Sequence, residues 1–171
     1  VKIFVPGDPS SAAFFTALTL LNKNSSLLIK NICLNETRVG FYKLLKQKGG
    51  RINFINQKKV NNEIVGDILV KSSKLRSINA SKKYYVNSTD EYPILFVIAA
   101  LTNGISIFKG IEDLANKESN RIKEMQKILK QIGVKSKSSK NQLKIYGKGL
   151  IKGKNKLIKV PNLGDHRICM S

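Results

Sequence analysis

An internal repeat is the feature that most limits what this chain can fold into. Two halves of the sequence carry the same three features in the same order: an Asp that opens an apolar segment, a β-rich stretch and a Lys-rich segment that ends in Gly. The offsets between partners are 82, 79 and 84 residues. Three ordered matches at nearly one offset predict two structural units of the same kind. The matching pairs are Asp8 with Asp90, 28–32 with 107–111, and 43–49 with 127–133.

Each unit is expected to run in the order βαβαββ. A short strand ends at the Asp, which caps an apolar helix. A β-rich strand, an amphipathic helix that ends at Gly, and two closing strands follow. The expected helices are 10–22, 37–49, 92–103 and 119–133, and the expected strands are 26–33, 51–56, 64–70, 105–111, 134–136 and 142–146. The Lys/Ser run 135–140 is expected to be a hairpin loop.

The repeat also predicts how the chain divides. Two complete units are expected at 1–73 and 74–148, and Asp165 opens a truncated third unit at 149–171. The chain begins at Val1 in a strand-like run and ends at Ser171 in what reads as the first turn of a helix. We therefore expect it to be an internal fragment of a longer protein.

The composition is strongly basic, with 31 Lys+Arg against 11 Asp+Glu and a formal net charge of +20. This balance makes nucleic acids, membrane surfaces and small anions candidate binding partners. However, Lys, Asn and Ile together make 62 of the 171 residues, and all three have A/T-rich codons. We hypothesise that the 26 Lys largely reflect genome composition; an equal Lys excess in relatives from GC-rich genomes would contradict this. The five Arg are then more informative, because Arg binds carboxylate and phosphate bidentately.

Several classes of protein are excluded. The longest clean apolar run, 94–101, is eight residues long and much shorter than a membrane span. Two cysteines, Cys33 and Cys169, exclude a disulfide scaffold, and both are expected to be buried. No metal site is expected, since His166 is the only histidine and no paired Cys ligands occur. The chain also lacks a Walker loop and a dinucleotide fingerprint.

The three aspartates at predicted helix starts allow two interpretations. Asp8, Asp90 and Asp165 can each be an N-cap. If the units pack symmetrically, their helix N-termini can instead converge on an anionic ligand. Arg38 is a possible structural partner for Asp8 or Glu36.

Two short clusters carry the remaining candidates. Glu118 and Arg121 are three residues apart, which on a helix gives an ordinary surface ion pair. Lys117, however, would stand in the first helical turn, where the helix dipole disfavours a cation, and this misfit favours a functional role. Around Asp165, spacing alone predicts an N-cap with exposed neighbours, His166 and Arg167.

Taken together, five strings resemble the 5-enolpyruvylshikimate-3-phosphate synthase family, in family order across essentially the whole chain. They are 6–15 (PGDPSSAAFF), 35–40 (NETRVG), 90–95 (DEYPIL), 117–121 (KESNR) and 164–170 (GDHRICM). The resemblance implies an α/β (α+β) fold of two domains, each with three βαβαββ units about a pseudo-threefold axis, the inside-out α/β barrel of enolpyruvyl transferases. The chain would be about two-fifths of such an enzyme, from the C-terminal-side domain.

The resemblance also implies a reaction. The enolpyruvyl group of phosphoenolpyruvate is transferred to the 5-hydroxyl of 3-phosphoshikimate, with release of phosphate and without a metal or organic cofactor. By matching motif positions, Asp90 would be the base at the shikimate hydroxyl and Glu118 the proton donor and acceptor at the methylene. Lys117 would bridge both substrates. A cytoplasmic (or, in a plant or alga, plastid) enzyme, monomeric at full length, is implied.

The same carry-over gives the anion-binding residues. Arg121 and Arg167 would grip phosphoenolpyruvate, with His166 as a supporting residue. The sequence departs from the family pattern at Asn120, within the string 117–121, and at residues 115–116 just before it. These departures concern the surroundings of the proposed site residues rather than the site residues themselves. Asp113 falls where some members have Asn or Glu near the shikimate ligand, and its role stays open.

Groups that the rest of the enzyme gives to the substrate cleft are not in this chain, so the fragment alone is expected to be inactive. Two other functions remain as alternatives. One is the enolpyruvyl transferase that acts on UDP-N-acetylglucosamine, which has the same fold, although the strings at 117–119 and 165–167 argue against it. The other is a basic RNA-binding module, which would need Lys gathered on one face with aromatic side chains to stack on bases.

Overall fold

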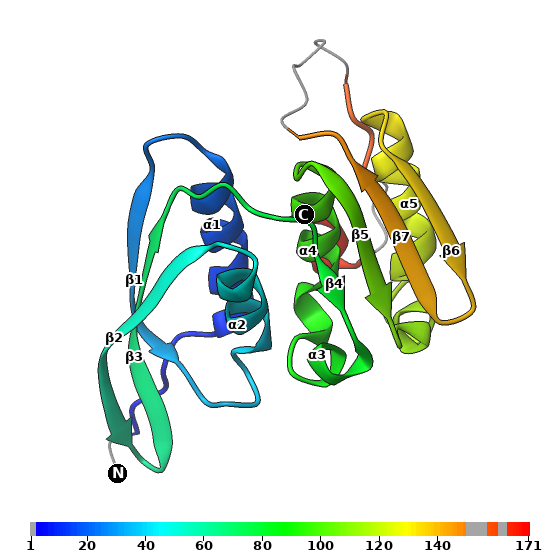
Figure 1. Ribbon diagram of the computed structural model, residues 1–171. Coiled ribbons are helices and arrows are strands. Elements are labelled where there is room, and N and C mark those ends of the chain that lie inside the picture. The colour runs from blue at the N-terminus through cyan, green and yellow to red at the C-terminus, as the bar shows by residue number, and fades with distance from the viewer. Residues whose placement is uncertain (1–2, 150–156, 161–163) are drawn as a thin grey trace. The chain divides into compact units, whose positions relative to one another are not determined.

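The computed structural model describes residues 3–149, 157–160 and 164–171 and contains two compact units, Val1–Leu75 and Arg76–Ser171. Both units combine helices with a small sheet whose strand pairs are mostly antiparallel (Figure 1). The mixed α/β class is therefore confirmed. The division at 73, 148 and 171 stays a prediction, and much of the expected third unit, residues 150–156 and 161–163, lies outside the described residues.

The first unit is a three-stranded sheet with two helices. Its strands lie in the order β1-β3-β2, and every pair is antiparallel. Helix α1 packs against β1 and β3, and α2 packs against β2. Gly7 adds a single bridge, parallel to β1, at Ile32. The elements are α1 (Pro9–Leu21), β1 (Ser26–Cys33), α2 (Gly40–Gln47), β2 (Arg51–Val60) and β3 (Glu63–Lys71).

The second unit has a four-stranded sheet in the order β4-β5-β7-β6. The β4–β5 pair is parallel and the other pairs are antiparallel. Two 3₁₀ turns, η1 and η2, precede the helices α4 and α5. The elements are β4 (Asn79–Ala80), α3 (Lys82–Val86), η1 (Thr89–Glu91), α4 (Tyr92–Ala100), β5 (Gly104–Lys109), η2 (Glu112–Asn116), α5 (Arg121–Gln131), β6 (Lys135–Ser139), β7 (Gln142–Gly147) and α6 (His166–Cys169).

The two sheets follow one plan. In the first unit the order is Gly7, β1, β3, β2, and in the second it is β4, β5, β7, β6. In both, the first contact is parallel and the others are antiparallel. The similarity between the two halves of the sequence thus corresponds to one topology that is used twice.

The core of the second unit forms around α4. Eight of its nine residues are buried, because the helix is apolar on all sides. The ring of Tyr92 makes edge-to-face contacts with Phe96 and Phe108, at centroid distances of 5.9 and 5.8 Å. Such contacts stabilise aromatic pairs beyond the apolar area that they bury. The resulting aromatic cluster fixes the position of the turn that precedes α4.

Two expected elements are wrong. The segment before Asp90 is not a strand: β4 ends at Ala80, and α3 and η1 lead into α4. The hydroxyls of Ser88 and Thr89 donate to the carbonyls of Tyr84 and Tyr85, which favours a helical turn over an extended strand. The expected loop at 135–140 is largely strand β6, since its backbone pairs with β7 over five residues.

Smaller differences concern helix ends and one cysteine. Helix α5 begins at Arg121, where Asn120 caps it by accepting a hydrogen bond from the Lys123 amide. Cys33 is buried as expected, but Cys169 is exposed, because the short helix α6 turns Ile168 inward instead. No helix in the described part of the chain has the length and apolarity that crossing a membrane requires.

Asp67 holds two irregular strand pairs together. Its carboxylate accepts hydrogen bonds from the backbone N–H of Asn31 (2.9 Å) on β1 and from the side-chain amide of Asn56 (2.8 Å) on β2. Both ladders shift register beside it, and both asparagines have a positive φ, which Asn tolerates better than most residues. The bulge on β1 also carries the Asn31 carbonyl that accepts from the Gly7 amide at 2.8 Å. One carboxylate therefore shapes the sheet and supports the bridge that leads to Asp8.

Replacement of Asp67 by Ala should lower the free energy of unfolding of the chain, because two donors lose their acceptor. The hydrogen bonds from Asn56 and Asn31 lower the pKa of Asp67. Its contribution should therefore be present above about pH 4 and lost as the pH falls through the lowered pKa. Urea denaturation at pH 7 and pH 3 measures both effects. Glu63→Ala on the exposed end of β3 is the control, and equal stability of the two variants at pH 7 would contradict this role for Asp67.

Candidate functional site

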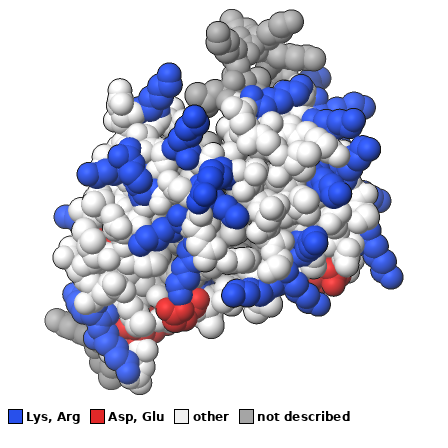
Figure 2. All heavy atoms as spheres, in the orientation of Figure 1, with Lys and Arg blue, Asp and Glu red and all other residues white. Residues whose placement is uncertain are grey.

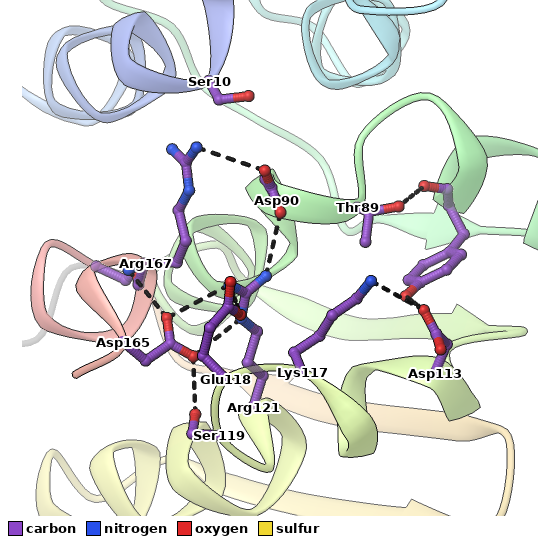
Figure 3. Close-up of polar contacts among 12 residues, drawn as sticks. Ser10, Thr89, Asp90, Asp113, Lys117, Glu118, Ser119, Arg121, Asp165 and Arg167 are labelled. Atoms are coloured by element: carbon purple, nitrogen blue, oxygen red, sulfur yellow. Dashed lines mark hydrogen bonds and ion pairs between the residues drawn. The ribbon is translucent and has the colours of Figure 1, made fainter. Parts of the chain in front are cut away.

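A buried arginine lies at the centre of the candidate site, which belongs to the second unit. Arg121 is the first residue of α5, and its side chain is only 1% exposed. Its guanidinium contacts three carboxylates, those of Asp165, Asp90 and Glu118 (Figure 3). Because a buried cation is costly without compensation, these carboxylates are what allow Arg121 to lie there.

Asp165 is the inner partner of Arg121 and is fully buried. Its Oδ2 accepts from Arg121 Nε at 3.0 Å and from Ser119 Oγ at 2.8 Å, and its Oδ1 lies 3.4 Å from Arg121 Nη2. The same carboxylate caps α6 by accepting from the Arg167 amide at 3.1 Å. The N-cap expected at Asp165 is confirmed, and the structure adds an ion pair to a residue 44 positions away, which no local pattern indicates.

Asp90 and Glu118 are the outer partners. Asp90 Oδ1 lies 3.2 Å from Arg121 Nη1, and Glu118 Oε2 lies 2.6 Å from Arg121 Nη2. Their side chains are 48% and 57% exposed. A second guanidinium, that of Arg167, reaches Asp90 Oδ2 at 3.4 Å. Two accessible acids and two arginines thus share one network, which we call the Arg121 network (Asp90, Glu118, Arg121, Asp165 and Arg167).

The electrostatics of the inner pair follow from its partners. Burial by itself would raise the pKa of Asp165, but the hydrogen bonds from Arg121 and Ser119 and the charge of Arg121 outweigh burial and lower that pKa. Burial would likewise lower the pKa of Arg121, and its bonds to Asp165 and Asp90 outweigh that effect and raise it. Both groups therefore stay charged over the whole neutral range.

Lys117 belongs to a neighbouring cluster. Its Nζ lies 3.1 Å from Asp113 Oδ2, which also accepts from the Tyr85 hydroxyl at 3.0 Å. Lys117 follows η2 in an extended conformation and precedes α5, so it does not stand in a helical first turn as the sequence predicts. The bonds from Lys117 and Tyr85 lower the pKa of Asp113. Tyr85 and Ser119 are polar partners to which the sequence patterns assign no role, and Asp113 is a residue whose role they leave open.

The other candidates are placed as follows. Asp90 does not cap α4: it lies in η1, and Glu91 occupies the cap position, where its side chain accepts no capping bond from the first turn of α4. Glu118 pairs with Arg121 as expected, although it precedes the helix and its partner is buried rather than on the surface. His166 is exposed at the start of α6, and none of the bonds within the Arg121 network involves it.

The first unit carries a related but exposed pair. Asp8 caps α1 by accepting from the amides of Ser10 (3.2 Å) and Ser11 (2.9 Å), as expected. Arg38 Nη2 lies 2.8 Å from Asp8 Oδ1, with side-chain exposures of 49% and 41%. Arg38 therefore pairs with Asp8, and Glu36 pairs with Lys43 instead. The Asp–Arg combination recurs in both units, but only the second unit buries its arginine.

These groups define what the site can do chemically. Two guanidinium groups offer a planar set of donors that suits carboxylate and phosphate. The accessible carboxylates of Asp90 and Glu118 beside them can accept or deliver protons. Over the described residues, no three His, Cys, Asp or Glu side chains gather as metal ligands. The arrangement is suited to an anionic ligand whose reaction needs both proton transfer and charge stabilisation.

Arg121→Met should lower the free energy of unfolding by about 3 kcal/mol at pH 7, because it leaves the carboxylate of Asp165 buried without its cation. Arg38→Met is the matched control, and should cost less than about 1 kcal/mol because its pair is exposed. The additional loss of stability in Arg121→Met compared with Arg38→Met should shrink below about pH 4, because protonation removes the buried charge of Asp165. Urea denaturation of both variants at pH 7 and pH 3 tests this, and equal losses at pH 7 would show that burial of Arg121 contributes little.

Comparison with known proteins relates these residues to a family. The family model for EPSP synthase (3-phosphoshikimate 1-carboxyvinyltransferase) matches residues 1–171. The chain is 41% identical over 169 residues to the 3-phosphoshikimate 1-carboxyvinyltransferase of Clostridium tetani and 41% identical over 172 residues to that of Zymomonas mobilis. Each match covers 99% of this chain and 38% of the relative, so the chain spans about two-fifths of the length of these curated proteins.

Solved structures agree. An EPSP synthase from Acinetobacter baumannii matches 97% of this chain and 38% of its own, with a TM-score of 0.88 and 31% identity. The enolpyruvyl transferase NikO from Streptomyces tendae matches 85% of this chain and 31% of its own, with a TM-score of 0.55 and 13% identity, and thus shares the fold alone. These structures support the enolpyruvyl transferase fold implied by the resemblance. The chain belongs to the EPSP synthase family.

Proposed function

We propose that this chain is part of an enzyme that transfers the enolpyruvyl group of phosphoenolpyruvate to the 5-hydroxyl of 3-phosphoshikimate and releases phosphate. The observation that carries the proposal is the Arg121 network, in which four residues from three separate family strings, Asp90, Glu118, Arg121 and Arg167, share connected hydrogen bonds. The remaining three-fifths of the enzyme would supply the other substrate contacts.

The proposed proton transfers use the two outer carboxylates. Asp90 takes the proton of the 5-hydroxyl while the oxygen of that hydroxyl forms a bond to the central carbon of phosphoenolpyruvate. Glu118 gives a proton to the methylene carbon in the same addition. Glu118 then takes a proton back from that carbon as the bond to the phosphate oxygen breaks, which restores the double bond. The leaving phosphate takes up the proton that Asp90 accepted. The side chains of Asp90 and Glu118 are about half exposed, which leaves both carboxylates accessible to a substrate.

The proposed anion contacts use the cations around these acids. Arg121 and Arg167 hold phosphoenolpyruvate, Lys117 bridges both substrates, and His166 supports them. Asp90 and Glu118 occupy donors of Arg121. A bound anion would take over such donors and free the carboxylates for proton transfer.

The distribution of charge supports small anionic substrates. On the face drawn in Figure 2, Lys and Arg side chains are scattered rather than gathered in one patch. On this face, the cations therefore do not form the continuous basic groove of a nucleic-acid channel. We therefore infer that recognition depends on Lys117, Arg121 and Arg167 and not on the net charge. A cytoplasmic location and a monomeric full-length enzyme remain predictions.

The full-length enzyme should release phosphate from phosphoenolpyruvate in the presence of 3-phosphoshikimate, and the purified 171-residue chain should not. The reason is that the chain spans only 38% of its relatives. A phosphate-release assay measures both. UDP-N-acetylglucosamine as the acceptor is the discriminating control, since turnover of that substrate alone would replace this proposal with the related transferase.

In the full-length enzyme, Glu118→Gln should lower kcat by roughly 10²- to 10⁴-fold, because the amide keeps the size of the side chain but cannot transfer the proton. KM for both substrates should change much less. Glu36→Gln, an exposed carboxylate in the first unit, is the matched control. A kcat within about twofold of the parent enzyme would remove Glu118 from the proton-transfer role.

A further inference from the structure

Tyr85 contacts two short turns beside the proposed catalytic groups: η1, which contains Asp90, and η2, which ends directly before Lys117. Through its side chain it reaches η2, where its hydroxyl donates to Asp113 Oδ2 at 3.0 Å. Through its backbone it reaches η1, where its carbonyl accepts from Thr89 Oγ at 2.8 Å. Thr89 directly precedes Asp90, and Asp113 directly contacts Lys117. Figure 3 shows Thr89, Asp113 and Lys117 beside the Arg121 network.

The side-chain contact constrains Lys117. The Tyr85 hydroxyl and the Lys117 ammonium share a single acceptor atom, Asp113 Oδ2. Asp113 is 56% exposed, and an exposed carboxylate on a short 3₁₀ turn has several rotamers to choose from. A fixed donor on one side selects one of them and so determines where the ammonium of Lys117 lies.

Tyr85 is itself well fixed. The residue is 8% exposed, and its ring meets Tyr92 edge to face at a centroid distance of 5.2 Å. Tyr92 is in turn part of the aromatic cluster with Phe96 and Phe108. Burial, and then the adjacent Asp113, raise the pKa of the Tyr85 hydroxyl far above neutrality, so it remains a donor at every working pH.

We propose that Tyr85 is a positioning residue of the active site: its hydroxyl orients Lys117 through Asp113, while its carbonyl orients Asp90 through Thr89. The significance of Lys117 and Asp90 rests on the proposed function, but the two contacts are independent of it. Because one residue serves both segments, the core around α4 sets the spacing between the base and the bridging cation.

The kinetic test separates the two contacts in the full-length enzyme. Tyr85→Phe keeps the ring and the carbonyl and removes only the hydroxyl, so KM for both substrates should rise roughly 3- to 10-fold while kcat changes less than about twofold. Thr89→Val removes the hydroxyl that precedes Asp90, so kcat should fall by a similar factor with KM for phosphoenolpyruvate nearly unchanged. The matched control is Tyr146→Phe on β7, whose ring lies near Lys135 instead.

A double variant tests whether Tyr85 acts through Asp113. If it does, Tyr85→Phe should have little further effect on KM in an Asp113→Ala background, because the acceptor that it orients is already gone. Fully additive effects, or a Tyr85→Phe enzyme with the kinetics of the parent enzyme, would overturn the side-chain part of the proposal. An unchanged kcat in Thr89→Val would overturn the backbone part.

A structural readout keeps the proposal separate from the proposed function. The Asp113 carboxyl, faced by Lys117 and Tyr85, can be titrated by ¹³C NMR and assigned by its disappearance in Asp113→Asn. Loss of the Tyr85 hydroxyl should move the pKa of Asp113 up towards its ordinary value. An unchanged pKa would refute the orienting contact. A shifted pKa in an enzyme that does not use these substrates would refute the proposed function and leave the contact established.

Discussion

The buried ion pair between Arg121 and Asp165 is the interaction on which the second unit depends. Neither charge could stay in the interior alone. Arg121, the first residue of α5, must therefore contact Asp165, the N-cap of α6. This single requirement fixes the guanidinium plane, and with it the direction of the nitrogens that face outward. Asp90 and Glu118 bind to those outward nitrogens. The geometry of the accessible acids therefore follows from the buried pair of Arg121 and Asp165.

The repeat allows a comparison of what burial does to the same residue types. In the first unit, Arg38 and Asp8 make a close pair that remains open to solvent, and Asp8 serves as an ordinary helix cap. In the second unit, the equivalent arginine is covered, and it gathers three carboxylates. A common topology thus accommodates a structural pair in one copy and a chemically useful network in the other. The difference lies in Asp165, which comes from outside the repeated segment.

The sequence predicted the parts that local patterns control. The strand Ser26–Cys33, the apolar helix that starts at Tyr92, and the caps at Asp8 and Asp165 follow from periodicity and side-chain chemistry nearby in the chain. The prediction from sequence failed where pairing in the sheet outweighed the local preference of the residues. At β6 the Lys/Ser composition is typical of a loop, but the backbone pairs with β7 and completes the sheet. The Arg121–Asp165 and Tyr85–Asp113 contacts span 44 and 28 positions, and only the folded chain brings such partners together.

Strand β6 gives the abundant lysines a consequence of their own. It is the last strand of its sheet in the order described, and Lys135 and Lys137 recur along it with the period of a strand. An edge of this kind leaves backbone donors and acceptors open to strands of other molecules. Closely spaced ammonium groups repel a second copy of the same edge before such pairing can begin. A compositional bias that says little about the substrate can thus protect the protein from self-association.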